Sequence, residues 1–156
     1  MDELALSNQA ISEFDEIYNK CISTGVIRHL TYTSKYPLFM FLNYVIENKN
    51  VLVHGSNNHD ITHFEPRDSS LFKGQPINAV FASSDGVWSL FFAVKNREEH
   101  MSVRNLCLTM PTKKGKKRYY YFSRHDDEAT SIWRDGAIYM FSKDKFKQGG
   151  IRDMGL

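Results

Sequence analysis

A short motif at the end of an apolar run is the first candidate for chemistry in this sequence. Residues 51–56 read Val-Leu-Val-His-Gly-Ser, which predicts a buried strand followed by three residues that can contact a ligand. Gly55 permits a close approach to its backbone N–H and C=O. His54 can hydrogen-bond a ligand hydroxyl through one ring nitrogen while a backbone partner fixes the other. The same residues also suit a turn after a strand, with His54 as a capping side chain, and the spacing alone favours the turn.

The next residues contain two more histidines and an arginine. His59 and His63 lie four apart with Asp60 between them, a spacing that suits two metal ligands on a helix. The surrounding asparagines predict a loop, and no third ligand is obvious nearby, so we expect no metal site. Arg67 has a planar guanidinium that fits a phosphate or a carboxylate. An ion pair with a neighbouring acid such as Asp68 explains Arg67 equally well.

A second segment, residues 79–93, reads as a strand, a Ser-Asp-Gly turn and an apolar aromatic stretch. Ser84 or Asp85 suits the N-cap of a short helix in this stretch, although a strand is also compatible with it. Phe91 and Phe92 fit a core, which is the default interpretation. They also fit a wall on which a flat ring could stack.

One local run of charge stands out against an ordinary balance. The net charge is +2 and the pI is near 8.5, so the bulk composition gives no sign of nucleic-acid binding. The run Lys113-Lys114-Gly115-Lys116-Lys117-Arg118 could contact phosphates, and residues 119–121, three tyrosines, could stack on bases. A solvated hairpin tip is the favoured interpretation of the run.

The apolar pattern predicts the elements that position these residues. Residues 4–23 carry apolar side chains at spacings of three and four, and a second helix begins at Pro37 and ends in the polar turn 47–50. Beyond residue 50 the pattern changes to short strands, at 51–53, 78–83, 103–110, 118–123 and 137–141, with a hairpin loop over 110–118. These elements predict an α+β domain with a mixed, mostly antiparallel sheet.

Length and composition set the remaining expectations. The chain of 156 residues is 42% hydrophobic and 24% charged, which is typical of a globular protein and suits a single domain, residues 1–156. Residues 1–50 form its helical layer, and residues 51–156 form its β-rich core. The N-terminus is acidic where a signal peptide is basic, and no apolar run reaches membrane length. Cys21 and Cys107 stand alone, which suits a reducing compartment. We expect a cytoplasmic protein that does not enter a membrane.

The two apolar segments together resemble the ADP-ribosyltransferase superfamily, in its branch related to diphtheria toxin and the poly-ADP-ribose polymerases. In that branch one strand ends in His-Gly-Ser or His-Gly-Thr and a later strand ends in Tyr-Phe-Ala. A serine and an aromatic residue on a helix follow, and a glutamate on a late strand comes last. This chain has, in the same order, His54-Gly55-Ser56, then Val80-Phe81-Ala82, then Ser89 with Phe91 or Phe92.

The resemblance implies a split β-sheet after the two N-terminal helices, and NAD as a substrate with no metal. It implies that the Gly55 backbone and the Ser89 side chain bind the nicotinamide amide. His54 would bind the ribose on the adenosine side, and an aromatic ring near Phe91 would stack on nicotinamide. The NAD site predicted in this way consists of His54, Gly55, Ser56, Arg67, Phe81, Ser89, Phe91 and Phe92.

The catalytic carboxylate of the family has no clear counterpart here. Breaking the glycosidic bond of NAD builds positive charge on the ribose, and the late glutamate stabilises that charge. After the strand at 137–141 the sequence contains no glutamate, so Asp153 is the candidate substitute, with His54 as the second catalytic residue. Glu128 lies in an acidic loop and receives little weight. If Asp153 does not replace the glutamate, either the chain stops before the catalytic strand or the domain binds NAD without transferring ADP-ribose.

Three functions are therefore open. The first is an NAD-dependent ADP-ribosyltransferase acting on a protein or nucleic-acid target. The second is a non-catalytic module that binds NAD or ADP-ribose. The third is a nucleic-acid-associated protein that uses residues 113–118 and the tyrosines after them. A tRNA 2′-phosphotransferase-like activity combines these features and would need basic residues such as Arg67, Arg97 or Arg104.

Overall fold

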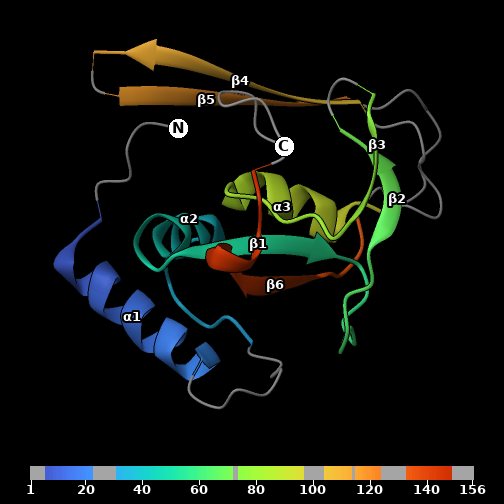
Figure 1. Cartoon of the computed structure of the whole chain (residues 1–156). Helices are drawn as coiled ribbons and strands as arrows, with labels where there is room; N and C mark the ends of the chain where they lie inside the picture. The colour runs from blue at the N-terminus through green and yellow to red at the C-terminus, as the bar shows by residue number, and fades with distance from the viewer. Residues whose placement is uncertain are drawn as a thin grey trace.

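The computed structural model describes residues 6–22, 31–71, 74–96, 104–113, 115–123 and 133–148. Within these ranges the elements follow in the order α1 (Asn8–Ile22), α2 (Leu38–Asn48), β1 (Val51–Ser56), β2 (Arg67–Ser70), β3 (Pro76–Ala79), α3 (Gly86–Val94), β4 (Arg104–Thr112), β5 (Gly115–Ser123), β6 (Ala137–Ser142) and the 3-10 helix η1 (Lys143–Lys145) (Figure 1).

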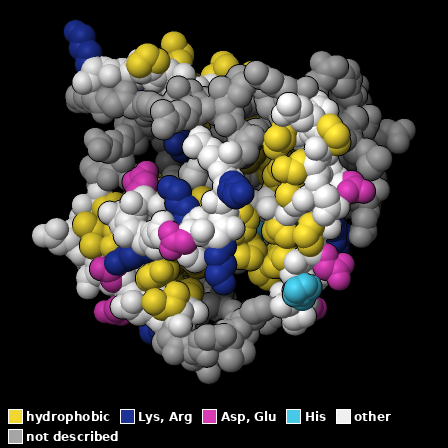
Figure 2. All heavy atoms as spheres, viewed as in Figure 1, with side chains coloured by type: hydrophobic (Ala, Val, Ile, Leu, Met, Phe, Trp, Pro, Cys, Tyr) yellow, Lys and Arg dark blue, Asp and Glu magenta, His cyan; other side chains and the backbone are white. Residues whose placement is uncertain are grey.

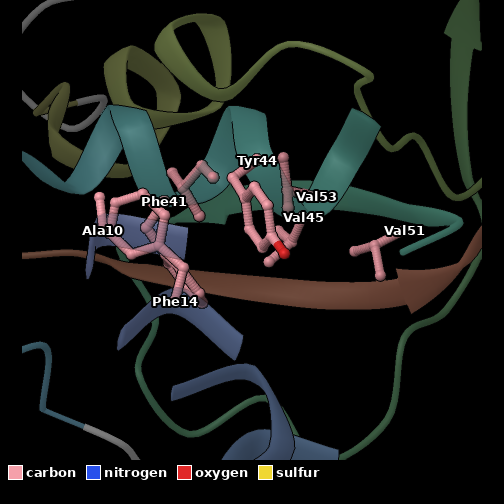
Figure 3. Close-up of a cluster of buried hydrophobic side chains, with 8 residues drawn as sticks. Ala10, Phe14, Phe41, Tyr44, Val45, Val51 and Val53 are labelled. Atoms are coloured by element: carbon pink, nitrogen blue, oxygen red, sulfur yellow. The ribbon is translucent and has the colours of Figure 1, made fainter. Parts of the chain in front are cut away.

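The hydrophobic core lies between the two N-terminal helices and β1. Figure 3 shows its side chains converging from α1, α2 and β1. Phe14 of α1 is fully buried and meets Phe41 and Tyr44 of α2 with ring centroids 5.6 Å apart in both pairs. Such edge-on and tilted ring pairs stabilise a core beyond the area they bury. The apolar stripes of the two helices are therefore covered by each other and by β1.

At the centre of the fold, β1 and β6 form an antiparallel pair. The register places His54 opposite Tyr139 and Gly55 opposite Ile138. The other edge of β1 makes one bridge, in which Val53 and Ser83 exchange two backbone hydrogen bonds of 2.9 and 2.7 Å. Helix α3 packs across this pair, as the ribbon shows (Figure 1). The fold thus holds residues 53–55, residue 83 and α3 together.

Two antiparallel hairpins complete the described fold. The β2–β3 hairpin pairs Arg67 with Ala79, and the β4–β5 hairpin lies over α3 (Figure 1). The second hairpin is anchored to the N-terminus of α3, because Arg118 and Tyr120 of β5 both contact the carboxylate of Asp85.

The α+β class predicted from sequence is confirmed. The described strands form three two-stranded antiparallel pairs, β1–β6, β2–β3 and β4–β5. Both N-terminal helices lie where the periodicity predicts them, and residues 86–94 are helical rather than extended. A split sheet of the ADP-ribosyltransferase type stays a prediction. None of the helices described in this structure is long and apolar enough to cross a membrane.

Two predicted boundaries were wrong. The predicted loop 110–118 is mostly strand, since β4 runs to Thr112 and β5 begins at Gly115. Pro111, paired with Lys116, needs no N–H at an edge, so it does not interrupt β4. The predicted strand 78–83 is interrupted. β3 ends at Ala79, and only Ser83 forms a further bridge.

Candidate functional site

His54 is fixed at the end of β1 by a backbone partner. Its Nδ1 lies 2.7 Å from the carbonyl oxygen of Phe81, and its ring meets the ring of Phe64 edge-on with centroids 5.2 Å apart. A carbonyl can only accept, so Nδ1 carries the proton of this bond and Nε2 is the nitrogen with the lone pair in the neutral ring. The sequence predicted that a backbone partner would fix one ring nitrogen, but it did not identify Phe81 as that partner. A ligand at the other nitrogen stays a prediction.

Gly55 lies against α3 so closely that no side chain fits. A Cβ at this position would meet the carbonyl oxygen of Ser89 at 2.0 Å and the backbone nitrogen of Ala93 at 2.7 Å. Backbone groups alternate between the two edges of a strand. Because Val53 bonds to Ser83, the N–H and C=O of Gly55 point to that same edge, away from β6. Close packing thus explains the glycine, and the strand geometry aims its polar groups toward residues 80–82.

Ser89 and Phe91 have structural partners. The Ser89 hydroxyl is 2% exposed and donates to the carbonyl of Val53 at 3.3 Å. Phe91 is 5% exposed, and its ring stacks on Phe122 of β5 with centroids 4.0 Å apart and planes 15° apart. Phe122 therefore covers one face of the Phe91 ring. The ligand contacts predicted for these two residues stay predictions.

The other predicted site residues lie at varying distances from His54. Phe81 is 43% exposed, and its backbone carbonyl accepts the hydrogen bond from the His54 ring. The Ser56 hydroxyl accepts from the Asn58 N–H at 3.1 Å, which suits the predicted turn after the strand. Phe92 packs edge-on against Phe91 and Trp88. Arg67 is exposed at the start of β2, and no described contact brings it to His54.

The loop after β1 packs on the face of the β1–β6 pair that carries His54, opposite the face that packs on α3. Phe64 packs edge-on against Tyr139 and Phe141 as well as against His54. The Tyr139 hydroxyl donates to the Asn58 carbonyl at 2.7 Å and accepts from the Ile61 N–H at 3.1 Å. Phe64 of this loop thus joins Tyr139 and Phe141 of β6 in an aromatic cluster beside His54. The sequence offered no sign of it, because Phe64 stands alone among polar residues.

The two other histidines, both in that loop, are possible metal ligands by residue type. His59 and His63 are exposed. Among the residues that the structure describes, no three potential ligands from His, Cys, Asp and Glu come together.

A buried polar cluster around Asp85 was only partly predicted. Asp85 is 4% exposed and caps α3 by accepting from the Trp88 N–H at 3.1 Å. Its second oxygen accepts from Arg118 at 3.1 Å and from the Tyr120 hydroxyl at 2.6 Å. Burial, together with the hydrogen bond to Asp85, raises the pKa of Tyr120. The turn predicted the cap, whereas Arg118 and Tyr120 gave no signal because strand pairing decides which side they face.

Several predicted residues fall outside the described ranges. They are Asp153, Glu128, Arg97 and the side chain of Arg104. A hollow of about 230 Å³ lies at the other end of β1, lined by residues such as Tyr18, Val51 and Met140. It is separate from the His54 centre.

No protein-family model matches this chain, and no curated protein or solved structure matches it at a significant level. The function is therefore inferred from the geometry at the end of β1 and from the motifs that converge there.

Proposed function

We propose that this chain is an NAD-binding protein of the ADP-ribosyltransferase type, with its site at the end of β1. One observation carries the proposal. Gly55 contacts Ser89, Val53 bridges to Ser83, and His54 bonds to Phe81, so three motifs separated along the sequence meet at one point. These are the segments on which the resemblance rests.

The backbone of Gly55 suits the amide of nicotinamide. A carboxamide has one C=O acceptor and an NH₂ donor side by side, which complement the N–H and C=O that a strand residue presents at one edge. Gly55 presents this pair toward residues 80–82, which form no strand, and the Phe81 carbonyl there accepts a bond from the His54 ring. The amide would pair with β1 as a short strand does.

His54 suits a ribose hydroxyl. The bond from Nδ1 to Phe81 sets the tautomer, so the lone pair of Nε2 accepts from a hydroxyl donor. The Phe64 ring holds the imidazole from the side. A ligand that presents an amide to Gly55 and a ribose to His54 is a nicotinamide dinucleotide or a part of one.

Thermal unfolding with NAD tests the binding. A ligand that binds only the folded state stabilises it by mass action, by about 2.7 kcal/mol at a concentration of 100 times Kd. We expect NAD to raise the Tm of the wild type and His54→Ala to lose that increase, each measured against its own ligand-free Tm. His63→Ala, an exposed histidine in the adjacent loop, is the matched control and keeps the increase. An equal NAD-induced increase in the Tm of His54→Ala would show that NAD does not bind at His54.

Release of nicotinamide separates transfer from binding alone. Transfer breaks the bond between the nicotinamide nitrogen and the ribose carbon and joins that carbon to a nucleophile of a macromolecular target. Asp153 is the candidate carboxylate for the positive charge that develops on the ribose. A transferase releases nicotinamide from labelled NAD, and Asp153→Asn slows the release. A module that only binds NAD or ADP-ribose shows the Tm increase without release.

A further inference from the structure

The β4–β5 hairpin has two unlike faces. Paired residues of an antiparallel ladder share a face. One face holds Cys107 opposite Tyr120 and Asn105 opposite Phe122, and it is turned to α3. Tyr120 bonds to Asp85, and Phe122 stacks on Phe91. These contacts fix the orientation of the hairpin, so the opposite face is turned away from the helix.

The outward face is a row of exposed rings and apolar side chains. Leu106 lies opposite Tyr121, Leu108 opposite Tyr119 and Met110 opposite Lys117. Tyr121 and Met110 are each 54% exposed, and the other three apolar or aromatic members are 39% to 49% exposed. Figure 2 shows hydrophobic side chains along the upper edge, where Figure 1 places this hairpin, with a basic side chain projecting beyond them. Exposed apolar faces of this kind mark interaction sites.

The charge of the hairpin defines the partner. Between residues 104 and 123 the sequence has six Lys or Arg and no Asp or Glu, although the whole chain has a net charge of only +2. Arg118 is paired with Asp85, whereas Lys113 is exposed at the tip and Lys117 lies over the Tyr119 ring, 5.5 Å from its centroid. The partner of this face is therefore an anion with flat apolar groups.

We propose that the outward face of the β4–β5 hairpin binds single-stranded nucleic acid. Tyr119 and Tyr121 stand two residues apart on one strand, which separates their Cα atoms by roughly 7 Å and gives successive unpaired bases a ring each. Lys113 and Lys117 contact the phosphates. In a duplex the bases are stacked on each other and cannot reach the rings, so the face selects single strands.

The same charge argues against a second copy of this chain as the occupant. Two hairpins that each lack acidic residues would bring like charges together, and opposed like charges cost free energy at an interface. This binding surface is independent of the NAD site at the end of β1.

Fluorescence anisotropy with labelled oligonucleotides tests the proposal, in the absence of NAD. The probes are twenty-nucleotide dT and rU strands, a duplex of the same length, and anionic lipid vesicles. We expect saturable binding of the single strands and at least ten-fold weaker binding of the duplex. The affinity falls as salt is raised, with a log–log slope of about −0.7 for each phosphate contacted. Comparing the dT strand with the rU strand shows whether the ribose 2′-hydroxyl contributes to the affinity.

Substitutions locate the binding. Tyr119→Ala with Tyr121→Ala weakens binding by roughly ten-fold or more per ring, whereas the Tyr→Phe pair retains it because the ring faces remain. Lys113→Gln with Lys117→Gln lowers the salt slope. Lys145→Gln with Lys147→Gln, two exposed lysines outside the hairpin, is the control and changes the slope little.

Four outcomes would overturn the proposal. They are no binding of either strand, equal binding of the Tyr→Ala pair and the wild type, binding of the vesicles alone, and a dimer in solution that the Tyr→Ala pair dissociates. The substituted tyrosines are exposed, so the variants fold, and their circular dichroism and Tm verify this.

Discussion

At the scale of single residues, Gly55 is explained by packing as well as by the proposed ligand. The approach of α3 leaves no room for a Cβ, since Ser89 and Ala93 backbone atoms stand where it would be. Gly136 meets the same helix, with the Ala93 carbonyl oxygen 1.9 Å from its ideal Cβ position. Close packing against α3 is therefore sufficient to require a glycine at residue 55, independently of the proposed ligand.

Replacing Gly55 with alanine tests the packing cause. Because backbone cannot yield as a flexible side chain does, Gly55→Ala should lower the free energy of unfolding by at least about 2 kcal/mol. Urea denaturation measures this change. Gly74→Asn is the control, because residue 74 has open space around it and a φ of 76°, which asparagine tolerates. Its stability should change by less than about 0.5 kcal/mol. An equally stable Gly55→Ala variant would show that α3 does not approach β1 this closely.

At the scale of elements, α3 connects the proposed site to the hairpin. Its first turn is capped by Asp85, which also binds Arg118 and Tyr120 of β5. Its middle residues contact β1, where the Ser89 hydroxyl donates to the Val53 carbonyl. The orientation of the hairpin and the position of the Gly55 edge thus depend on the same short helix.

The Tyr120–Asp85 bond predicts a dependence of stability on alkaline pH. The folded pKa of Tyr120 is raised above the ordinary value near 10, first by burial and then by the bond to Asp85. The folded state therefore holds the proton more tightly than the unfolded state does. This stabilisation is complete below pH 10 and is lost as pH rises above it.

Comparison with Tyr120→Phe isolates this effect. At pH 8 the wild type should be more stable than the variant by about 1 to 3 kcal/mol, as for a hydrogen bond to a charged group. The difference should narrow by pH 11 in urea denaturation, because ionisation of Tyr120 favours the unfolded wild type. Tyr121→Phe, on the exposed face, should follow the wild type at both pH values. A difference that stays constant from pH 8 to pH 11 would contradict the assignment.

At the scale of the whole molecule, periodicity predicted α1, α2 and most strands, and it left residues 88–94 open between helix and strand. The spacing around Phe14 and Phe41 located α1 and α2 because each buries a stripe of its own sequence. The interruption after Ala79 could not be predicted. Within the interrupted segment, the Phe81 carbonyl is bonded to a histidine 27 residues away, a contact that local sequence does not reveal.

The candidate site was predictable in its motifs and not in its contacts. His54, Gly55 and Ser89 are local sequence features, and the structure brings them together. The ring of Phe122 on Phe91 and the ring of Phe64 beside His54 arise from elements distant in sequence. Local patterns carry no information about such contacts, so the sequence indicated a buried Phe91 but not its stacking on Phe122.

The central claim is that NAD binds at the Gly55 edge of β1. Heteronuclear NMR of the isotope-labelled protein during an NAD titration tests it most directly, through the Gly55 amide and the ring nitrogens of His54. We predict that both signals move together and saturate at one equivalent, while the amides of Tyr119 and Tyr121 on the outward hairpin face do not move. If the Gly55 and His54 signals stay fixed at saturating NAD, the claim is contradicted.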